Sequence, residues 1–230
     1  MPLIPDRQKV ELKRTLRTDL KGEVTLRLFT KRVSLLAIPG RECRSCSQTQ
    51  ELMEELVALS TKLHLETYDF YSHLEERNCY DVERIPAILL GKDNQARAKY
   101  YGIPGGQEFT ALLESIKAIS RSVSPLTMDS RKKLRRVNQQ VHIQVFVTLN
   151  SALSPQIGRM AHAMALETPF IKADVVDAEE FPALVQMYAV RSVPKTVINE
   201  LIQFDGPIAE SAFVEKVLQA GVREPETAGA

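Results

Sequence analysis

The chain has 230 residues, of which 44% are hydrophobic and 26% charged, with 30 lysines and arginines against 29 aspartates and glutamates. This length suits one large domain or two small ones, with a core that needs no disulfide cross-links. The near-neutral balance argues against a general nucleic-acid binder, which normally carries a marked basic excess. No apolar run reaches the roughly 18 residues of a membrane span, and the charged N-terminal stretch does not resemble a secretory signal. We therefore expect a cytoplasmic protein without a membrane partner.

The chain contains an internal repeat, which is the first feature to establish because it decides the fold. Each half shows an amphipathic helix, an apolar strand, a pair of small sulfur or hydroxyl residues opening a helix, a second strand, and a β-branched residue before proline. Three pairs of landmarks are each 108 residues apart: Cys43 and Ser151, Cys46 and Ser154, and Pro86 and Pro194. The first strands are 117 residues apart, as Phe29 and Phe146 show, so the first half carries nine extra residues. This insertion, from Lys31 to about Gly40, has no counterpart in the second half.

The predicted elements follow from hydrophobic periodicity and turn residues. We predict helices over residues 6–20, 47–62, 107–121, 129–140 and 210–220, strands over 24–30, 63–70, 141–148 and 170–176, and a hairpin after each proline, within 86–102 and 194–206. Each half is then α-β-α-β-β-β-α, with a parallel first strand pair joined by a right-handed crossover. A mixed four-stranded sheet with helices on both faces results in each half.

The domain boundaries follow from the repeat. Residues 1–122 form an N-terminal unit and residues 123–221 a C-terminal unit, joined through the short polar segment 122–127. Because this connector is short, we expect the two units to pack together. Residues 222–230 have no periodicity and are expected to be frayed.

The strongest chemical signal is Cys43-Arg44-Ser45-Cys46, in a loop between a strand and a helix. Two intervening residues allow the sulfurs to close a disulfide. The helix N-terminus favours an anion, and the thiolate is the form that attacks disulfides, so this setting activates Cys43. The flanking charges of Arg41, Glu42 and Arg44 sum to +1 and favour the thiolate further. A Cys-x-x-Cys beside a βαβ pattern is the general signature of a redox dithiol.

Other uses of a cysteine pair remain open at this point. A structural zinc site normally needs four ligands, and His64 and His73 lack the usual spacing. An iron–sulfur cluster shared between two chains and an inert buried pair are further alternatives. The polar residues Arg44 and Ser45 argue against an inert buried pair, and we interpret the pair as a redox dithiol.

Three other features have less specific interpretations. Cys79 ends a short predicted helix and is interpreted as a half-buried side chain, with a regulatory or intermolecular thiol as the alternative. Ser151 and Ser154 lack the G-x-S-x-G context of a nucleophilic serine. The basic run over residues 131–136 is interpreted as a solvated helix face, with an acidic protein or nucleic acid as the alternative contact.

The chain resembles the protein disulfide oxidoreductases of thermophilic archaea and bacteria, glutaredoxin-like proteins built from two thioredoxin folds in tandem. The resemblance covers about residues 6–220 and is carried by these stretches: Cys43 to Cys46, Arg84-Ile85-Pro86-Ala87, Tyr101-Gly102-Ile103-Pro104-Gly105-Gly106-Gln107-Glu108-Phe109, Arg159-Met160-Ala161-His162 and Val193-Pro194-Lys195. It implies an α/β fold of two thioredoxin-like units, each with a mixed central sheet flanked by helices. The arrangement is also similar, with the halves exchanged, to the N-terminal domain of the alkyl hydroperoxide reductase flavoprotein.

The sequence departs from this family where a second Cys-x-x-Cys often lies. Ser151 and Ser154 stand at those positions, and serine forms no disulfide, so we expect the second unit to be redox-inactive. The resemblance further implies that Pro86 and Pro194 are cis. The main chain of Ile85 would then lie against the dithiol and pair with an extended substrate strand, with Arg44 and Ser45 also at the substrate site.

These features predict a protein disulfide oxidoreductase with one working site. Cys43 is the expected nucleophile and Cys46 the resolving thiol. We expect no bound cofactor and no metal, disulfide-containing protein substrates, and electrons from a thioredoxin reductase-like flavoprotein or a small thiol. The competing hypothesis is a non-catalytic redox sensor or protein-binding module in which the cysteine pair is structural or regulatory.

Overall fold

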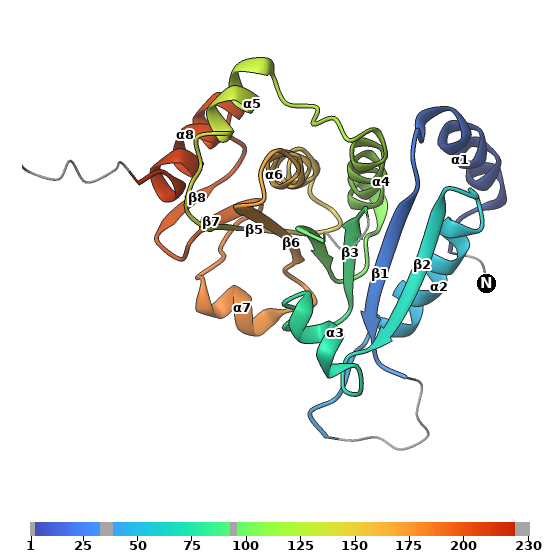
Figure 1. The fold of residues 1–230 in the computed structure, drawn as a ribbon. Coiled ribbons are helices and arrows are strands. Elements are labelled where there is room, and N and C mark those ends of the chain that lie inside the picture. Colours follow the sequence, from blue (N-terminus) through green and yellow to red (C-terminus); the bar gives the residue numbers. More distant parts are fainter. Residues whose placement is uncertain (1–2, 33–38, 93–95, 224–230) are drawn as a thin grey trace, which may run out of the picture.

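The computed structural model describes residues 3–32, 39–92 and 96–223, and its centre is one continuous mixed sheet (Figure 1). Within these ranges the sheet has eight strands in the order β2-β1-β3-β4-β6-β5-β7-β8. The first half supplies α1 (Asp6–Asp19), β1 (Val24–Thr30), α2 (Cys46–Val57), β2 (Leu63–Asp69), α3 (Leu74–Cys79), β3 (Ala87–Gly91), β4 (Ala98–Tyr101) and α4 (Gly106–Arg121). The second half supplies α5 (Met128–Leu134), β5 (Val141–Val147), α6 (Ser154–Glu167), β6 (Ile171–Asp177), α7 (Pro182–Met187), β7 (Lys195–Ile198), β8 (Ile202–Asp205) and α8 (Glu210–Gly221).

Each half builds the strand pattern predicted from the repeat. The first two strands of each half are parallel, β1 with β2 and β5 with β6, and the later hairpins β3–β4 and β7–β8 are antiparallel. The sequence does not predict how the two halves meet. β4 pairs in parallel with β6, from Ala98 opposite Ala173 to Tyr101 opposite Val176, and this pairing joins the two four-stranded sheets.

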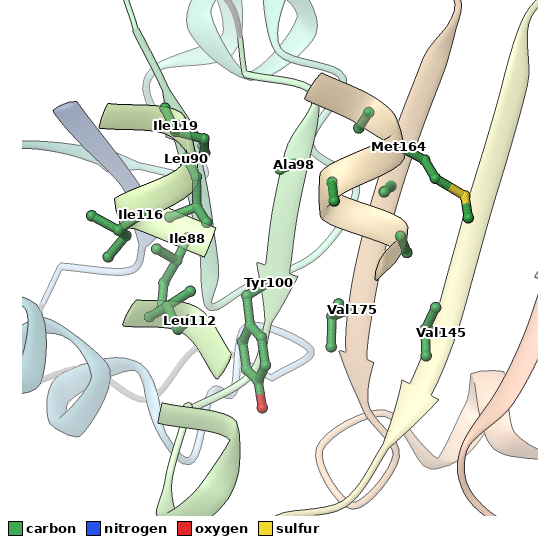
Figure 2. Close-up of a cluster of buried hydrophobic side chains, with 14 of the residues drawn as sticks. Ile88, Leu90, Ala98, Tyr100, Leu112, Ile116, Ile119, Val145, Met164 and Val175 are labelled. Atoms are coloured by element: carbon green, nitrogen blue, oxygen red, sulfur yellow. The ribbon is translucent and has the colours of Figure 1, made fainter. Parts of the chain in front are cut away.

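The sheet separates two hydrophobic clusters because successive strand residues point to opposite faces. The larger cluster lies under α1, α2, α4, α5, α6 and α8, and the smaller one lies on the face covered by α3 and α7. Figure 2 shows how the larger cluster continues across the β4–β6 junction, from Ile116 of α4 through Tyr100 of β4 to Val175 of β6. The two units therefore share one core.

Several element boundaries differ from those expected. The helix expected over 129–140 ends at Leu134, because the main-chain N–H groups of Asn138 and Gln139 turn away to the Gly221 carbonyl. The sequence prediction missed α7, a six-residue helix that begins at Pro182. The main chain of Arg223 exchanges hydrogen bonds with the Asn138 side chain, and residues 224–230 of the tail lie outside the described residues.

The basic run lies on and just after α5, where its lysines and arginines are exposed or paired with acids. Arg131 contacts Glu167 at 2.6 Å, and Lys133 contacts Glu215 at 3.0 Å. This agrees with the solvated-face interpretation. No helix of the described ranges has the length and apolar character needed to cross a membrane.

Candidate active site

Cys43 and Cys46 are joined in a disulfide at one end of β1, with their Cα atoms 5.5 Å apart. Cys46 is the first residue of α2 and is buried, whereas Cys43 precedes the helix and is half-buried. The disulfide holds the Cys43 sulfur beside the first turn of α2, where free amide groups and the helix dipole stabilise a thiolate. An accessible first sulfur and a protected second sulfur suit attack on an external disulfide followed by internal release.

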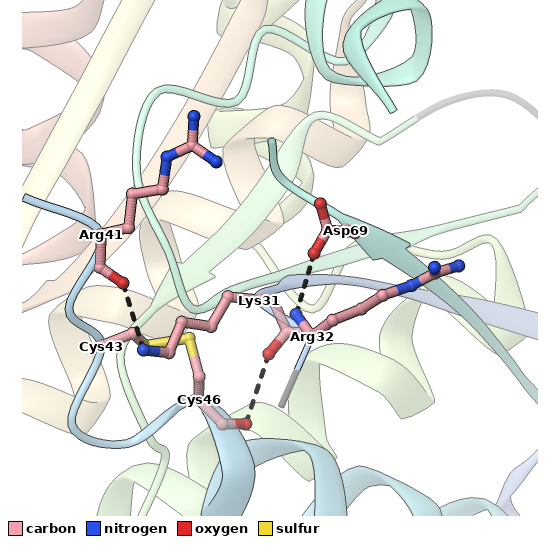
Figure 3. The surroundings of a disulfide bond; sticks show 7 residues. Lys31, Arg32, Arg41, Cys43, Cys46 and Asp69 are labelled. Carbon is pink, nitrogen blue, oxygen red and sulfur yellow. Dashed lines mark hydrogen bonds between the residues drawn. A yellow bond between two sulfur atoms is a disulfide. The ribbon is translucent and has the colours of Figure 1, made fainter. Parts of the chain in front are cut away.

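The loop before the dithiol is tied at both ends (Figure 3). The Lys31 ammonium donates to the Arg41 main-chain carbonyl at 3.1 Å, which links the two ends of the insertion. The Arg32 N–H donates to the Asp69 carboxylate at 2.8 Å. The Arg41 guanidinium lies 4.5 Å from the centre of the Tyr71 ring and points away from the sulfurs. Residues 33–38, the middle of the insertion, lie outside the described residues.

The Ile85–Pro86 peptide bond is cis, as the resemblance implies. Pro86 directly precedes β3, whose Ala87 pairs with Phe29 of β1, so the proline lies beside Thr30 at the dithiol end of the sheet. The Thr30 hydroxyl in turn faces the Cys46 carbonyl at 3.5 Å. Ile85 is half-buried, and within the described residues its main-chain N–H and C=O have no hydrogen-bond partner. The main chain beside the dithiol therefore has hydrogen-bonding groups that the described residues leave unused.

The two residues between the cysteines differ in exposure. Arg44 is exposed and has no ion pair among the described residues, which leaves its charge at the rim of the site. Ser45 is 3% exposed, and within the described residues its hydroxyl has no hydrogen-bond partner. Arg44 therefore presents a charged side chain beside the dithiol, whereas the Ser45 side chain is enclosed.

The second unit reproduces this arrangement with serines. α6 begins at Ser154, which is fully buried, and Ser151 is half-buried. The Ser154 N–H donates to the Ser151 hydroxyl at 3.2 Å. The Val193–Pro194 bond is also cis. The cysteine positions of the first unit are thus filled by residues that cannot carry a disulfide.

A buried carboxyl pair lies where α4 of the first unit meets the second unit. Glu108 and Asp177 are 1% and 2% exposed. Burial and the negative charge of Asp177 raise the pKa of Glu108 to about 7, and burial raises the pKa of Asp177 to about 6. We did not predict this pair. The available signal was that Glu108 lies four residues before Leu112, on the apolar stripe of its helix.

Cys79 is exposed and free, so the expectation of a half-buried side chain was wrong. The neighbouring Tyr80 and Val82 point toward the sheet and provide the packing at this helix end.

Within the described ranges, no three His, Cys, Asp or Glu side chains are grouped so as to hold a metal ion. The zinc alternative therefore has no ligand set in that part of the chain.

Comparison with known proteins identifies the fold. A model of the thioredoxin domain matches residues 141–219. The structure of a protein disulfide oxidoreductase from Aeropyrum pernix matches with a TM-score of 0.85 and 27% identity, over 95% of this chain and 94% of the other. The N-terminal domain of alkylhydroperoxide reductase AhpF from Enterococcus faecalis matches with a TM-score of 0.81 and 22% identity, over 93% and 99%.

Among curated sequences, an alkyl hydroperoxide reductase protein of Xanthomonas campestris is 24% identical over 168 residues, which is 73% of this chain and 30% of that protein. The chain spans about a third of the length of the curated relatives it matches. The matches confirm the predicted fold class, two thioredoxin-like units in tandem, with the Cys43–Cys46 pair in the first unit.

Proposed function

We propose that this tandem thioredoxin-fold chain catalyses thiol–disulfide exchange on protein disulfides through the single dithiol Cys43–Cys46. The observation that carries the proposal is the position of this pair. A half-accessible Cys43 and a buried Cys46 close a disulfide beside the cis Pro86. Residues 1–122 would form the working unit, and residues 123–221 a unit without redox chemistry of its own.

The reaction needs only the two sulfurs and a substrate disulfide. The Cys43 thiolate attacks one substrate sulfur, which forms a mixed disulfide and releases the other substrate sulfur as a thiolate. The Cys46 thiolate then attacks the Cys43 sulfur, which closes the internal disulfide and releases the second substrate thiolate. Two electrons pass from the dithiol to the substrate. The free main chain of Ile85 would hold the substrate strand during both steps, with Arg44 and Ser45 at its side.

The electron donor would be a thioredoxin reductase-like flavoprotein or a small thiol. The relatives that are named as alkyl hydroperoxide reductases favour a second version of the same chemistry. In that version the dithiol passes electrons to a partner protein that takes part in peroxide reduction. Both versions use Cys43 and Cys46 in the same roles and differ in the protein that receives the electrons.

Turnover separates this proposal from a redox sensor or scaffold. The purified chain should catalyse the reduction of insulin disulfides by dithiothreitol over many cycles. Cys43→Ser should abolish this activity, because it removes the attacking sulfur. Cys79→Ser is the matched control and should retain full activity, because Cys79 is exposed and outside the motif. A single change of redox state without turnover would support the sensor and contradict the proposal.

A further inference from the structure

The second unit has the same backbone arrangement as the redox site but has serines in place of the cysteines. Pro194 lies next to β7, whose Lys195 pairs with Phe146 of β5, in the same way that Ala87 pairs with Phe29 in the first unit. Ser151 and Ser154 have the same pattern of exposure as Cys43 and Cys46. What remains in the second unit is a surface beside a cis proline without a reactive group.

The main chain at this surface is unpaired. The β5–β7 ladder begins at Lys195, and the N–H and C=O groups of Val193 make no hydrogen bond within the described residues. Val193 as a whole is half-buried. An extended polypeptide running past Val193 could pair with these main-chain groups, as a strand pairs at a sheet edge.

Two apolar residues are exposed just before Ser154, where the first unit has polar residues before Cys46. Leu153 is 50% exposed, and the preceding Ala152 is also exposed. The residues at the corresponding positions of the first unit, 108 earlier, are the buried Ser45 and the charged Arg44. Leu153 directly precedes α6, at the same end of β5 as the unpaired main chain of Val193, and could contact an apolar side chain of an extended segment.

Both surfaces lie at the same end of the strands. β1 and β5 run parallel, because the two reversals of direction along the order β1-β3-β4-β6-β5 cancel. That order contains four strand spacings, or about 19 Å at roughly 4.8 Å each. An extended polypeptide covers this distance with about six residues. A segment of about six extended residues is therefore long enough to span the two surfaces.

We propose that the second unit binds an extended apolar segment of the same polypeptide whose disulfide reacts at Cys43. This inference rests on the proposed function for its substrate, whereas the binding itself needs no redox step. Two linked contacts bind more tightly than either alone, because the second becomes intramolecular. The second unit would therefore favour unfolded protein substrates over small disulfides.

The test measures binding without catalysis. A Cys43→Ser, Cys46→Ser variant cannot exchange disulfides, and its binding to fluorescein-labelled, iodoacetamide-alkylated insulin B chain can be followed by fluorescence anisotropy. We expect saturable binding. Adding Leu153→Asp should weaken the binding about five- to tenfold, because it replaces an apolar contact by a charge. Leu201→Asp is the matched control and should leave binding unchanged, since Leu201 is 88% exposed in the β7–β8 turn at the opposite end of the strands.

Three results would overturn the proposal. They are the absence of saturable binding, equal binding by the Leu153→Asp and Leu201→Asp variants, and a loss of self-association in Leu153→Asp with no change in peptide binding. The third would assign the surface to contacts between copies of the chain. The milder variant Leu153→Ser is measured alongside. Its helical circular dichroism should match that of the parent protein, which checks that a loss of binding is not a loss of folding. Because the assay uses protein without the dithiol, its outcome is independent of the insulin-reduction test of the proposed function.

Discussion

Replacing Glu108 by glutamine should stabilise the protein above neutral pH and change its stability much less in mild acid. The buried Glu108 carboxyl has a pKa of about 7, against an ordinary value of 4.5. The unfolded chain therefore releases this proton at lower pH than the folded chain does. The contribution of the protonated Glu108 carboxyl to the free energy of unfolding is fully present below pH 4.5 and is lost as the pH rises toward 7. The difference between the two pKa values corresponds to about 3 kcal/mol of unfolding free energy that is lost when Glu108 ionises. Glutamine carries no charge, so Glu108→Gln should regain this free energy above neutral pH.

Urea unfolding followed by circular dichroism measures this difference. The free energy of unfolding of Glu108→Gln should exceed that of the wild type by about 3 kcal/mol near pH 8 and by less than about 1 kcal/mol near pH 5. Glu114→Gln, on the same helix with its side chain 43% exposed, is the matched control and should show no such dependence on pH. If Glu108→Gln destabilised the protein near pH 8, the ionised carboxylate would have to be held by a cation, for which Arg159 is the candidate. The reasoning from burial would then be refuted.

Three further outcomes follow from the described geometry. Alkylation of the oxidised protein should label Cys79 alone, and reduction should expose two further thiols to mass-spectrometric counting; an unlabelled oxidised protein would show that Cys79 is paired. Gly102→Ala should cost about 2–4 kcal/mol in urea unfolding, because Gly102 has a φ of +111° and a Cβ there would lie 2.7 Å from the Asp177 Cβ, whereas Gly206→Ala, with a φ of +78° and open space, should cost only about 1 kcal/mol. Arg44→Glu should make the dithiol potential more negative by about 5–20 mV in a glutathione titration, because the lost positive charge no longer favours the thiolate, and an unchanged potential would contradict charge tuning.

The repeat made much of the site predictable. A common offset of 108 residues placed the cysteines, the serines and both prolines, and these residues occupy equivalent positions in the two units. Both prolines are cis, as the resemblance implied. These features could be predicted because they depend on local chain geometry, which short sequence motifs indicate.

Features set by contacts between distant segments were not predictable. The pairing of β4 with β6 is not evident from the sequence, because these strands carry charged residues such as Lys99 and Asp174 that do not indicate two strands buried on both faces. The burial of Glu108 depends on the same junction, because α4 buries it only where the second unit packs against the first. The exposure of Cys79 depends on which neighbours fill the space at the end of α3.

The β4–β6 pairing also determines where the molecule has free strand edges. Within the described residues, only β2 and β8 have an unpaired side, and both carry exposed polar residues that discourage edge-to-edge association. Cutting the chain after residue 122 would turn β4, whose Tyr100 and Tyr101 are almost fully buried, into a new apolar edge. A separated N-terminal half would therefore be prone to aggregate or to pair with a second copy, so the duplicated units have become parts of a single folding unit.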